Sequence, residues 1–95
     1  MEAEIIALDL TGAQSVREVH GRLKEAFGFP TYYGRNWDAL SDCLAERFGR
    51  ESRCQVEICG FFSMEEAVRR ACRPMLQIFN DIHEQSPDVQ FILTP

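Results

Sequence analysis

The chain has 95 residues, of which 45% are apolar, and its formal net charge is −5 at pH 7. This length suits one small domain that can fold around its own core without a metal ion or disulfides. The acidic balance argues against direct binding to RNA or DNA, which requires basic patches, and favours a basic protein partner; no segment approaches the roughly 20 apolar residues of a membrane span.

The first expected elements are a strand and a helix. Residues 4–10 form a short apolar run that is typical of a buried strand. Ser15 can cap the helix that follows, with Glu18 as its capping-box partner, and Gly28 favours the end of this helix. The apolar stripe of the helix consists of Val16, Val19, Leu23 and Phe27. His20 is expected at the surface or at the edge of the core, without a catalytic role.

A second helix is expected after a loop at residues 29–34. Asn36 is the expected N-cap of this helix, which runs to about Phe48. Its apolar residues recur at steps of three and four and can share one face: Trp37, Leu40, Leu44 and Phe48. The spacing leaves open whether Trp37 faces the core or a partner.

Two acidic residues lie on the flank of this second helix. Asp38 and Asp42 are four residues apart, and like charges at that spacing cost roughly 0.2–0.5 kcal/mol. Asp38 falls in the first turn, where negative charge is favoured, but Asp42 falls one turn later. With Tyr32 and Tyr33 just before the helix, the pair predicts a surface for a basic partner. The alternative is that the tyrosines fill a gap and the acids form a solvated face.

The second half of the chain predicts a strand, two helices and a last strand. Residues 54–59 alternate in polarity, which indicates a strand with one less buried face, interpreted as an edge strand. A capping box at Ser63 and Glu66 predicts a helix over 63–72, and Pro74 predicts a new helix over 74–85 with the proline in its first turn. The apolar face of that helix is Met75, Ile78, Phe79 and Ile82, and His83 is expected to face solvent at its end.

The last strand is expected from Val89 to Leu93, which gives the order β-α-α-β-α-α-β. Because helices separate every pair of strands, we expect an α/β fold in which about four helices pack on a three-stranded parallel sheet. The whole chain, residues 1–95, is expected to form this one domain.

The side chains that could carry chemistry form no recognisable catalytic or metal-binding motif. Nucleophile, phosphate-loop and zinc-protease motifs are missing. Asp38 and Asp42 could act as an acid–base pair, but an exposed helix offers no desolvated pocket that would separate their pKa values. We therefore expect no enzymatic activity, no cofactor and no metal site.

The cysteines and the N-terminus bear on the compartment. No pair of the four cysteines, Cys43, Cys54, Cys59 and Cys72, has C-x-x-C spacing, and we expect buried thiols without disulfides. The acidic start, Met1-Glu2-Ala3-Glu4, lacks the basic residues that open a signal peptide. These features predict a cytoplasmic protein.

The run Tyr32-Tyr33-Gly34-Arg35-Asn36-Trp37-Asp38-Ala39-Leu40-Ser41-Asp42-Cys43-Leu44 resembles a pattern of the barstar family of intracellular ribonuclease inhibitors. Every fixed position of the family's pattern, Tyr-Tyr-Gly-x-Asn-x-Asp-Ala-Leu-x-Asp-Cys-Leu, matches. In that family the run forms the loop and second helix that plug a ribonuclease active site. The likeness extends more weakly over nearly the whole chain, notably to 75–79 as the last helix and 88–93 as the closing strand.

The resemblance implies an inhibitor of a basic microbial ribonuclease of the extracellular type. Asp42 would mimic a phosphate, Asp38 would form a second ion pair, and Tyr32 would pack on the partner's catalytic-site residues. The surrounding contacts would come from Tyr33, Gly34, Asn36, Trp37 and Ser41.

Three departures from the family pattern leave the particular target open. Ser41 stands where the family has a tryptophan at the interface, Trp37 where it has a leucine, and Arg73 where it has an acidic residue. One alternative is an immunity protein against a toxin domain that is not a barnase-like ribonuclease. Another is an interaction module with no toxin partner. The oligomeric state is left open, with a monomer as the expectation.

Overall fold

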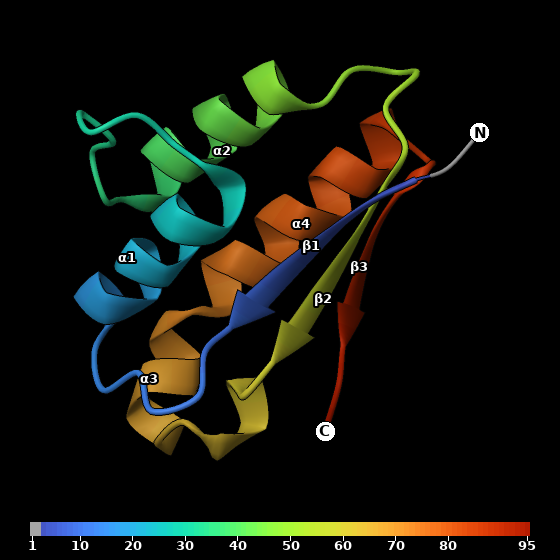
Figure 1. The fold of residues 1–95 in the computed structure, drawn as a ribbon. Coiled ribbons are helices and arrows are strands. Elements are labelled where there is room, and N and C mark those ends of the chain that lie inside the picture. The colour runs from blue at the N-terminus through green and yellow to red at the C-terminus, as the bar shows by residue number, and fades with distance from the viewer. Residues whose placement is uncertain (1–2) are drawn as a thin grey trace.

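The computed structural model describes residues 3–95, which form a parallel three-stranded sheet with helices on one side (Figure 1). The strands are β1 (Glu4–Asp9), β2 (Cys54–Cys59) and β3 (Val89–Leu93), in the order β1-β2-β3. The helices are α1 (Val16–Phe27), α2 (Trp37–Arg47), α3 (Glu66–Ala71) and α4 (Arg73–Gln85). The expected order β-α-α-β-α-α-β and the parallel sheet are therefore confirmed. The acidic start at Met1 and Glu2 lies outside the described residues.

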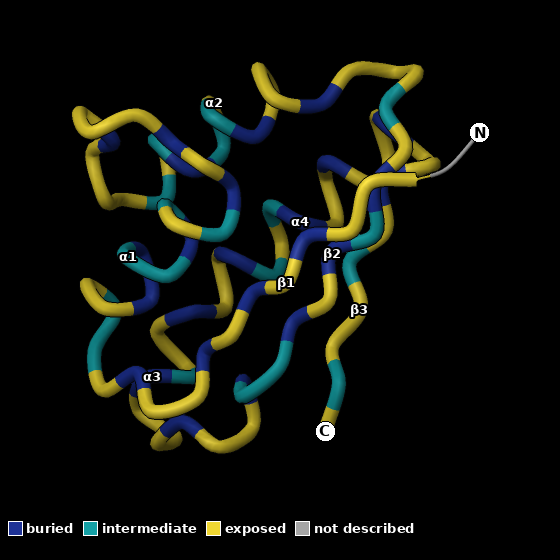
Figure 2. The backbone as a smooth tube through the Cα atoms, in the orientation of Figure 1, coloured by how far each residue is buried: buried dark blue, intermediate teal, exposed yellow. Residues whose placement is uncertain are grey.

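The sheet is covered on one face only, so the expectation of a fully buried first strand was wrong. Along β1, buried Ile6 and Leu8 alternate with exposed residues, and Ile5 keeps 65% of its surface accessible (Figure 2). Ile5 pairs with Gln55 on β2, and both belong to the uncovered face. An apolar run can therefore form a half-buried strand, because side chains alternate between the two faces of a sheet.

β2 is the central strand, which corrects its interpretation as an edge strand. It pairs in parallel with β1 through Val56 opposite Ile6, and with β3 through Val56 opposite Phe91. The alternating pattern was read correctly, since Cys54, Val56 and Ile58 are buried and Glu57 is exposed. The exposure of alternate residues comes from the uncovered face of the sheet, and not from a free edge.

The ends of α1 lie where the sequence predicted them. The Glu18 amide donates to Ser15 Oγ at 3.1 Å, and Gly28 ends the helix with a left-handed φ of 69°. The Glu18 carboxylate accepts from the amide of Gln14. In an ideal capping box it would accept from the amide of the N-cap residue itself, which is Ser15 here. The expected position of His20 at the surface or the edge of the core was wrong, because only 1% of its surface is exposed.

The predicted capping box at Ser63 does not form, and the third helix begins later than expected. Phe61–Ser63 form a short 3-10 turn, and Ser63 Oγ donates to the carbonyl of Gly60 at 2.8 Å. Ser63 is therefore part of this turn and does not precede a helix as an N-cap, and α3 begins only at Glu66. Pro74 lies in the first turn of α4, as predicted.

The core lies between the covered face of the sheet and the helices, with α2 and α4 side by side (Figure 1). The predicted apolar faces are confirmed by buried Leu40 and Leu44 on α2 and by buried Met75, Phe79 and Ile82 on α4. His83 is exposed as predicted. The four cysteines are free thiols; Cys54 and Cys72 are buried, and Cys43 and Cys59 are partly so. Within residues 3–95, no helix has both the length and the apolar character to cross a membrane.

Candidate partner-binding surface

The two adjacent tyrosines lie in a tight turn before α2, and their side chains point in opposite directions. The Tyr33 amide donates to the carbonyl of Pro30 at 2.9 Å, which closes the turn. Tyr32 projects outward with 84% of its surface exposed, whereas Tyr33 points into the protein with 6% exposed. Large exposed aromatic side chains are enriched at protein interfaces. Of the two tyrosines, Tyr32 is therefore the one available for direct contact.

Tyr33 anchors the loop from beneath. Its ring lies 4.9 Å from that of Phe29, and its hydroxyl lies 2.7 Å from Nδ1 of His20 on α1. Burial raises the pKa of Tyr33, and the nearby Cys43 thiol acts in the same direction. The hydroxyl therefore stays protonated and can serve as a hydrogen-bonding group at physiological pH.

The loop between Tyr33 and α2 has an unusual backbone. Arg35 has a φ of 52°, a left-handed conformation that costs roughly 1–2 kcal/mol for a residue with a side chain. A Cβ placed on Gly34 would lie 3.2 Å from Nδ2 of Asn36 and 3.4 Å from Cβ of Ala39. This close packing favours glycine at position 34. Such strain persists only where the surrounding contacts hold it.

Asn36 joins this loop to the helix. Its Oδ1 accepts from the Ala39 amide at 2.8 Å, which confirms the predicted N-cap, and its Nδ2 donates to the carbonyl of Gly34 at 3.3 Å. Trp37, the first residue of α2, is half-buried and packs on His20, with 4.3 Å between the ring centres. Trp37 thus contacts the core side of the loop while part of its ring stays accessible.

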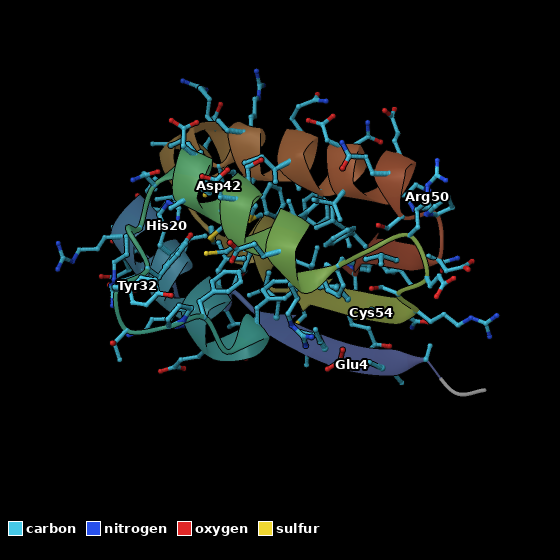
Figure 3. The ribbon with its side chains drawn as sticks, turned by 90° about the horizontal axis from the view of Figure 1, so that it is seen from above. Glu4, His20, Tyr32, Asp42, Arg50 and Cys54 are labelled. Carbon is cyan, nitrogen blue, oxygen red and sulfur yellow. The ribbon has the colours of Figure 1, made fainter. Side chains whose placement is uncertain are left out.

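The predicted acidic pair is displayed on α2. Asp38 and Asp42 are exposed, Ser41 beside them is half-buried, and neither carboxylate has an ion-pair partner among residues 3–95. Figure 3 shows Asp42 and Tyr32 at one end of the molecule, away from Glu4 and Arg50. Uncompensated carboxylates beside an exposed aromatic ring provide an anionic surface with a hydrophobic contact point.

Most of the predicted site residues are exposed or half-buried along the loop and the start of α2, and they are here called the loop–helix surface: Tyr32, Gly34, Asn36, Trp37, Asp38, Ser41 and Asp42. Tyr33 lies beneath that surface. The sequence did not predict the contacts of His20 with Tyr33 and Trp37, or the left-handed backbone of Arg35. Position 20 falls between Val19 and Leu23 on the apolar stripe of α1, a spacing that could have indicated burial. No sequence signal marks the left-handed backbone of Arg35.

A hollow in the structure is lined by other residues than those of this surface. A space of about 480 Å³ lies between α4 and β3, with Phe79, Phe91 and Leu93 in its lining, and none of the predicted site residues lines it. Within residues 3–95, no group of three or more His, Cys, Asp or Glu side chains could hold a metal ion.

Comparisons with known proteins show which sequences this chain resembles. The family model described as Barstar (barnase inhibitor) matches residues 3–94. The chain is also 46% identical over 39 residues to a protein of Bacillus subtilis (strain 168) named "Putative ribonuclease inhibitor YrdF". That match covers 41% of this chain and 43% of the relative, so the chain spans less than half the length of the curated relative that it matches.

Proposed function

This chain belongs to the barstar family, and we propose that it inhibits a basic ribonuclease by covering the enzyme's active site with the loop–helix surface. The observation that carries the proposal is the pair of exposed carboxylates, Asp38 and Asp42, on one rigid helix without ionic partners among the described residues. A ribonuclease must bind phosphates with Arg, Lys and His, and the same cations pair well with carboxylates. A helix that presents two carboxylates at one-turn spacing is complementary to such a site.

In this proposal each residue of the surface has a separate part. Asp42 occupies a phosphate subsite, Asp38 forms a second ion pair, and Tyr32 packs on the catalytic-site residues of the enzyme. Gly34 lets the loop approach closely, and the remaining contacts come from Asn36, Trp37 and Ser41. Tyr33 supports the loop from below, as its burial requires.

The protein binds and blocks in this proposal, and it does not catalyse. Asp38 and Asp42 are both exposed, and an acid–base pair needs environments that push the two pKa values apart. The formal net charge of −5 also speeds encounter with a basic enzyme, because electrostatic steering raises association rates. A cytoplasmic inhibitor of this kind would protect the RNA of its own cell.

The test is a titration of the purified protein into an RNA-cleavage assay with a ribonuclease of the barnase class. We expect stoichiometric inhibition by the wild-type protein. Asp42→Ala should weaken binding by about 2–5 kcal/mol, roughly 30- to 4,000-fold in Kd, because it leaves the cations of the enzyme buried and unpaired. Glu84→Ala is the matched control, since it removes one exposed carboxylate from α4 and should leave inhibition unchanged.

Two results of this titration contradict the proposal. One is a lack of inhibition by a wild-type protein that is shown to be folded by circular dichroism. The other is equal inhibition by Asp42→Ala and the wild type, which would mean that the acidic pair does not enter the active site.

A second candidate function is immunity against a toxin domain of another class. Arg73 is exposed at the start of α4, and Ser41 is a small residue on the adjoining α2. The positive charge of Arg73 and the small side chain of Ser41 suit a partner whose surface opposite these two residues differs from that of a barnase-like enzyme. Pull-down with the wild-type protein and with Asp42→Ala, followed by identification of the protein lost from the second sample, separates the two candidates.

A further inference from the structure

We propose that His20 is the positioning residue of the loop–helix surface: as a neutral imidazole it holds Tyr33 and Trp37 at the two ends of the loop, and its protonation weakens partner binding. The inference rests on the proposed function for its effect on binding. The effect on the loop itself does not depend on any partner.

The contacts of His20 bracket the exposed part of the loop. Its Nδ1 lies 2.7 Å from the Tyr33 hydroxyl, and its ring centre lies 4.3 Å from that of Trp37. Only residues 34–36 separate the two contact points. Tyr32 directly precedes the first contact and Asp38 directly follows the second, so two of the proposed partner-binding side chains flank the points held by His20. A shift of the imidazole therefore reaches both sides of the surface.

The loop held in this way is strained and needs support. Arg35 lies at its centre with a φ of 52°. The Nη1 of Arg35 would lie 3.7 Å from a Cβ placed on Gly21, so the guanidinium folds back against α1 next to His20. An unfavourable backbone conformation persists only when neighbouring contacts determine it. The contacts of Tyr33 and Trp37 with His20 provide this support from α1 on both sides of Arg35.

The surroundings of His20 favour its neutral form. Burial lowers the pKa of His20 below its usual value, and the Arg35 guanidinium lowers it further. From the loop, His20 faces Arg35 and the Tyr33 hydroxyl. From α2, it faces the uncharged ring of Trp37, while Cys43 lies close enough to Tyr33 to act on its pKa. Among the described residues, Arg35 is the charged group that shifts the pKa of His20.

Protonation would change both the charge and the hydrogen bonding at this point. In the neutral tautomer, Nδ1 can accept a hydrogen bond from the Tyr33 hydroxyl. An imidazolium is a donor at both ring nitrogens, so Nδ1 would instead donate to the Tyr33 oxygen, and the hydroxyl proton would need another acceptor. Protonation would also place a positive charge on a buried ring, which desolvation disfavours, and near the exposed guanidinium of Arg35, which repels it. The pKa of His20 is lowered from 6.5, so this change begins only as the pH falls below that value. Movement of Arg35 away from α1 is the direct way to relieve the repulsion.

The first experiment follows the free protein by NMR as the pH is lowered. We expect the His20 imidazole to titrate with a midpoint below its usual pKa, and the amide signals of Gly34 and Asn36 to shift with the same midpoint. In His20→Asn, whose side-chain amide can still bond to the Tyr33 hydroxyl but does not titrate, these amide shifts should be absent. The inference is overturned if these amide signals do not change as His20 titrates, or if they shift equally in His20→Asn. Neither outcome depends on a partner.

The second experiment measures Kd for the barnase-class ribonuclease across the same pH range. Wild-type affinity should fall by about tenfold for each pH unit below the His20 midpoint, as expected for one proton that must be released on binding. His20→Asn should give a flatter profile. Tyr33→Phe, which removes only the hydroxyl, should bind more weakly than the wild type at neutral pH while circular dichroism shows an intact fold.

The outcomes separate this inference from the proposed function. If the loop amide signals shift with the His20 titration but the protein does not inhibit the ribonuclease, the proposed function alone is contradicted. A protein that inhibits the ribonuclease, but with the same pH profile in the wild type and in His20→Asn, contradicts the inference alone. Equal binding by Tyr33→Phe and the wild type also contradicts it, because the hydrogen bond to His20 would then have no part in positioning.

Discussion

Removal of the N-cap of α2 by Asn36→Ala should destabilise the protein by a predictable amount. Asn36 Oδ1 accepts from the Ala39 amide at 2.8 Å, and loss of such a cap costs about 1 kcal/mol, with a range of roughly 0.5–2 kcal/mol. The second bond, from Nδ2 to the Gly34 carbonyl, is longer at 3.3 Å and exposed, so it adds little. For a domain of this size, each 1 kcal/mol shifts Tm by about 4–8 °C.

The assay is thermal and urea unfolding followed by far-ultraviolet circular dichroism, with Asn36→Asp as the control. Aspartate caps a helix as well as asparagine does, and its charge is favoured at a helix N-terminus. It cannot donate to the Gly34 carbonyl. We expect Asn36→Ala to lower Tm by about 4–8 °C, and Asn36→Asp to remain within about 0.5 kcal/mol of the wild type.

Either of two results would refute this reasoning. If Asn36→Ala unfolds like the wild type, the side-chain cap does not stabilise α2. If Asn36→Asp loses as much stability as Asn36→Ala, the amide bond to Gly34 is the stabilising contact, and the cap is not.

Three further predictions concern stability. A Cβ on Gly60, whose φ is 79°, would clash with the amide nitrogen of Thr11, so Gly60→Ala should cost more than the about 1–2 kcal/mol of left-handed strain alone. Gly28 has a φ of 69°, and a Cβ there would meet no atom within 4 Å, so Gly28→Ala should cost only that strain. Equal urea midpoints for the two variants would disprove the clash. Leu44 is fully buried, so Leu44→Ala should lose about 2–5 kcal/mol by the same assay, and a loss below about 1 kcal/mol would mean that the core collapses to fill the space. Because the pKa of His20 is lowered in the folded state, the neutral imidazole contributes fully to stability above its unfolded pKa of about 6.5, and this contribution is lost as the pH falls below that value. Urea unfolding at successive pH values should show this loss of stability in the wild type. The same loss in His20→Asn would assign it to other groups.

Local interactions explain the elements that the sequence predicted well. Ser15 and Gly28 delimit α1, and Asn36 starts α2, through hydrogen bonds and backbone angles within a few residues. Ser63 carried the same kind of signal and misled, because the residue belongs to a 3-10 turn before α3, in which its hydroxyl donates to Gly60. Two local structures compete for one such side chain, and the sequence pattern does not show which of them the tertiary fold favours.

The alternation along β2 shows a second limit. Side-chain polarity reports which face of a sheet is covered, and it was read correctly for Val56 and Glu57. The position of a strand within the sheet depends on its neighbours in space. Whether β2 is central or at an edge is decided by its pairing with β1 and β3, which lie far away in the chain.

The sequence by itself determined the order of the elements, the N-cap of α2 and the spacing that places Asp38 and Asp42 on one flank, because these properties follow from helical periodicity and short-range hydrogen bonds. Only the tertiary structure decided that Tyr32 is exposed while the identical residue Tyr33 is buried. That difference requires His20 on a separate helix to meet the Tyr33 hydroxyl. Such a contact forms only when the packing of α1 against the loop supplies a buried partner for a polar group that would otherwise remain in water.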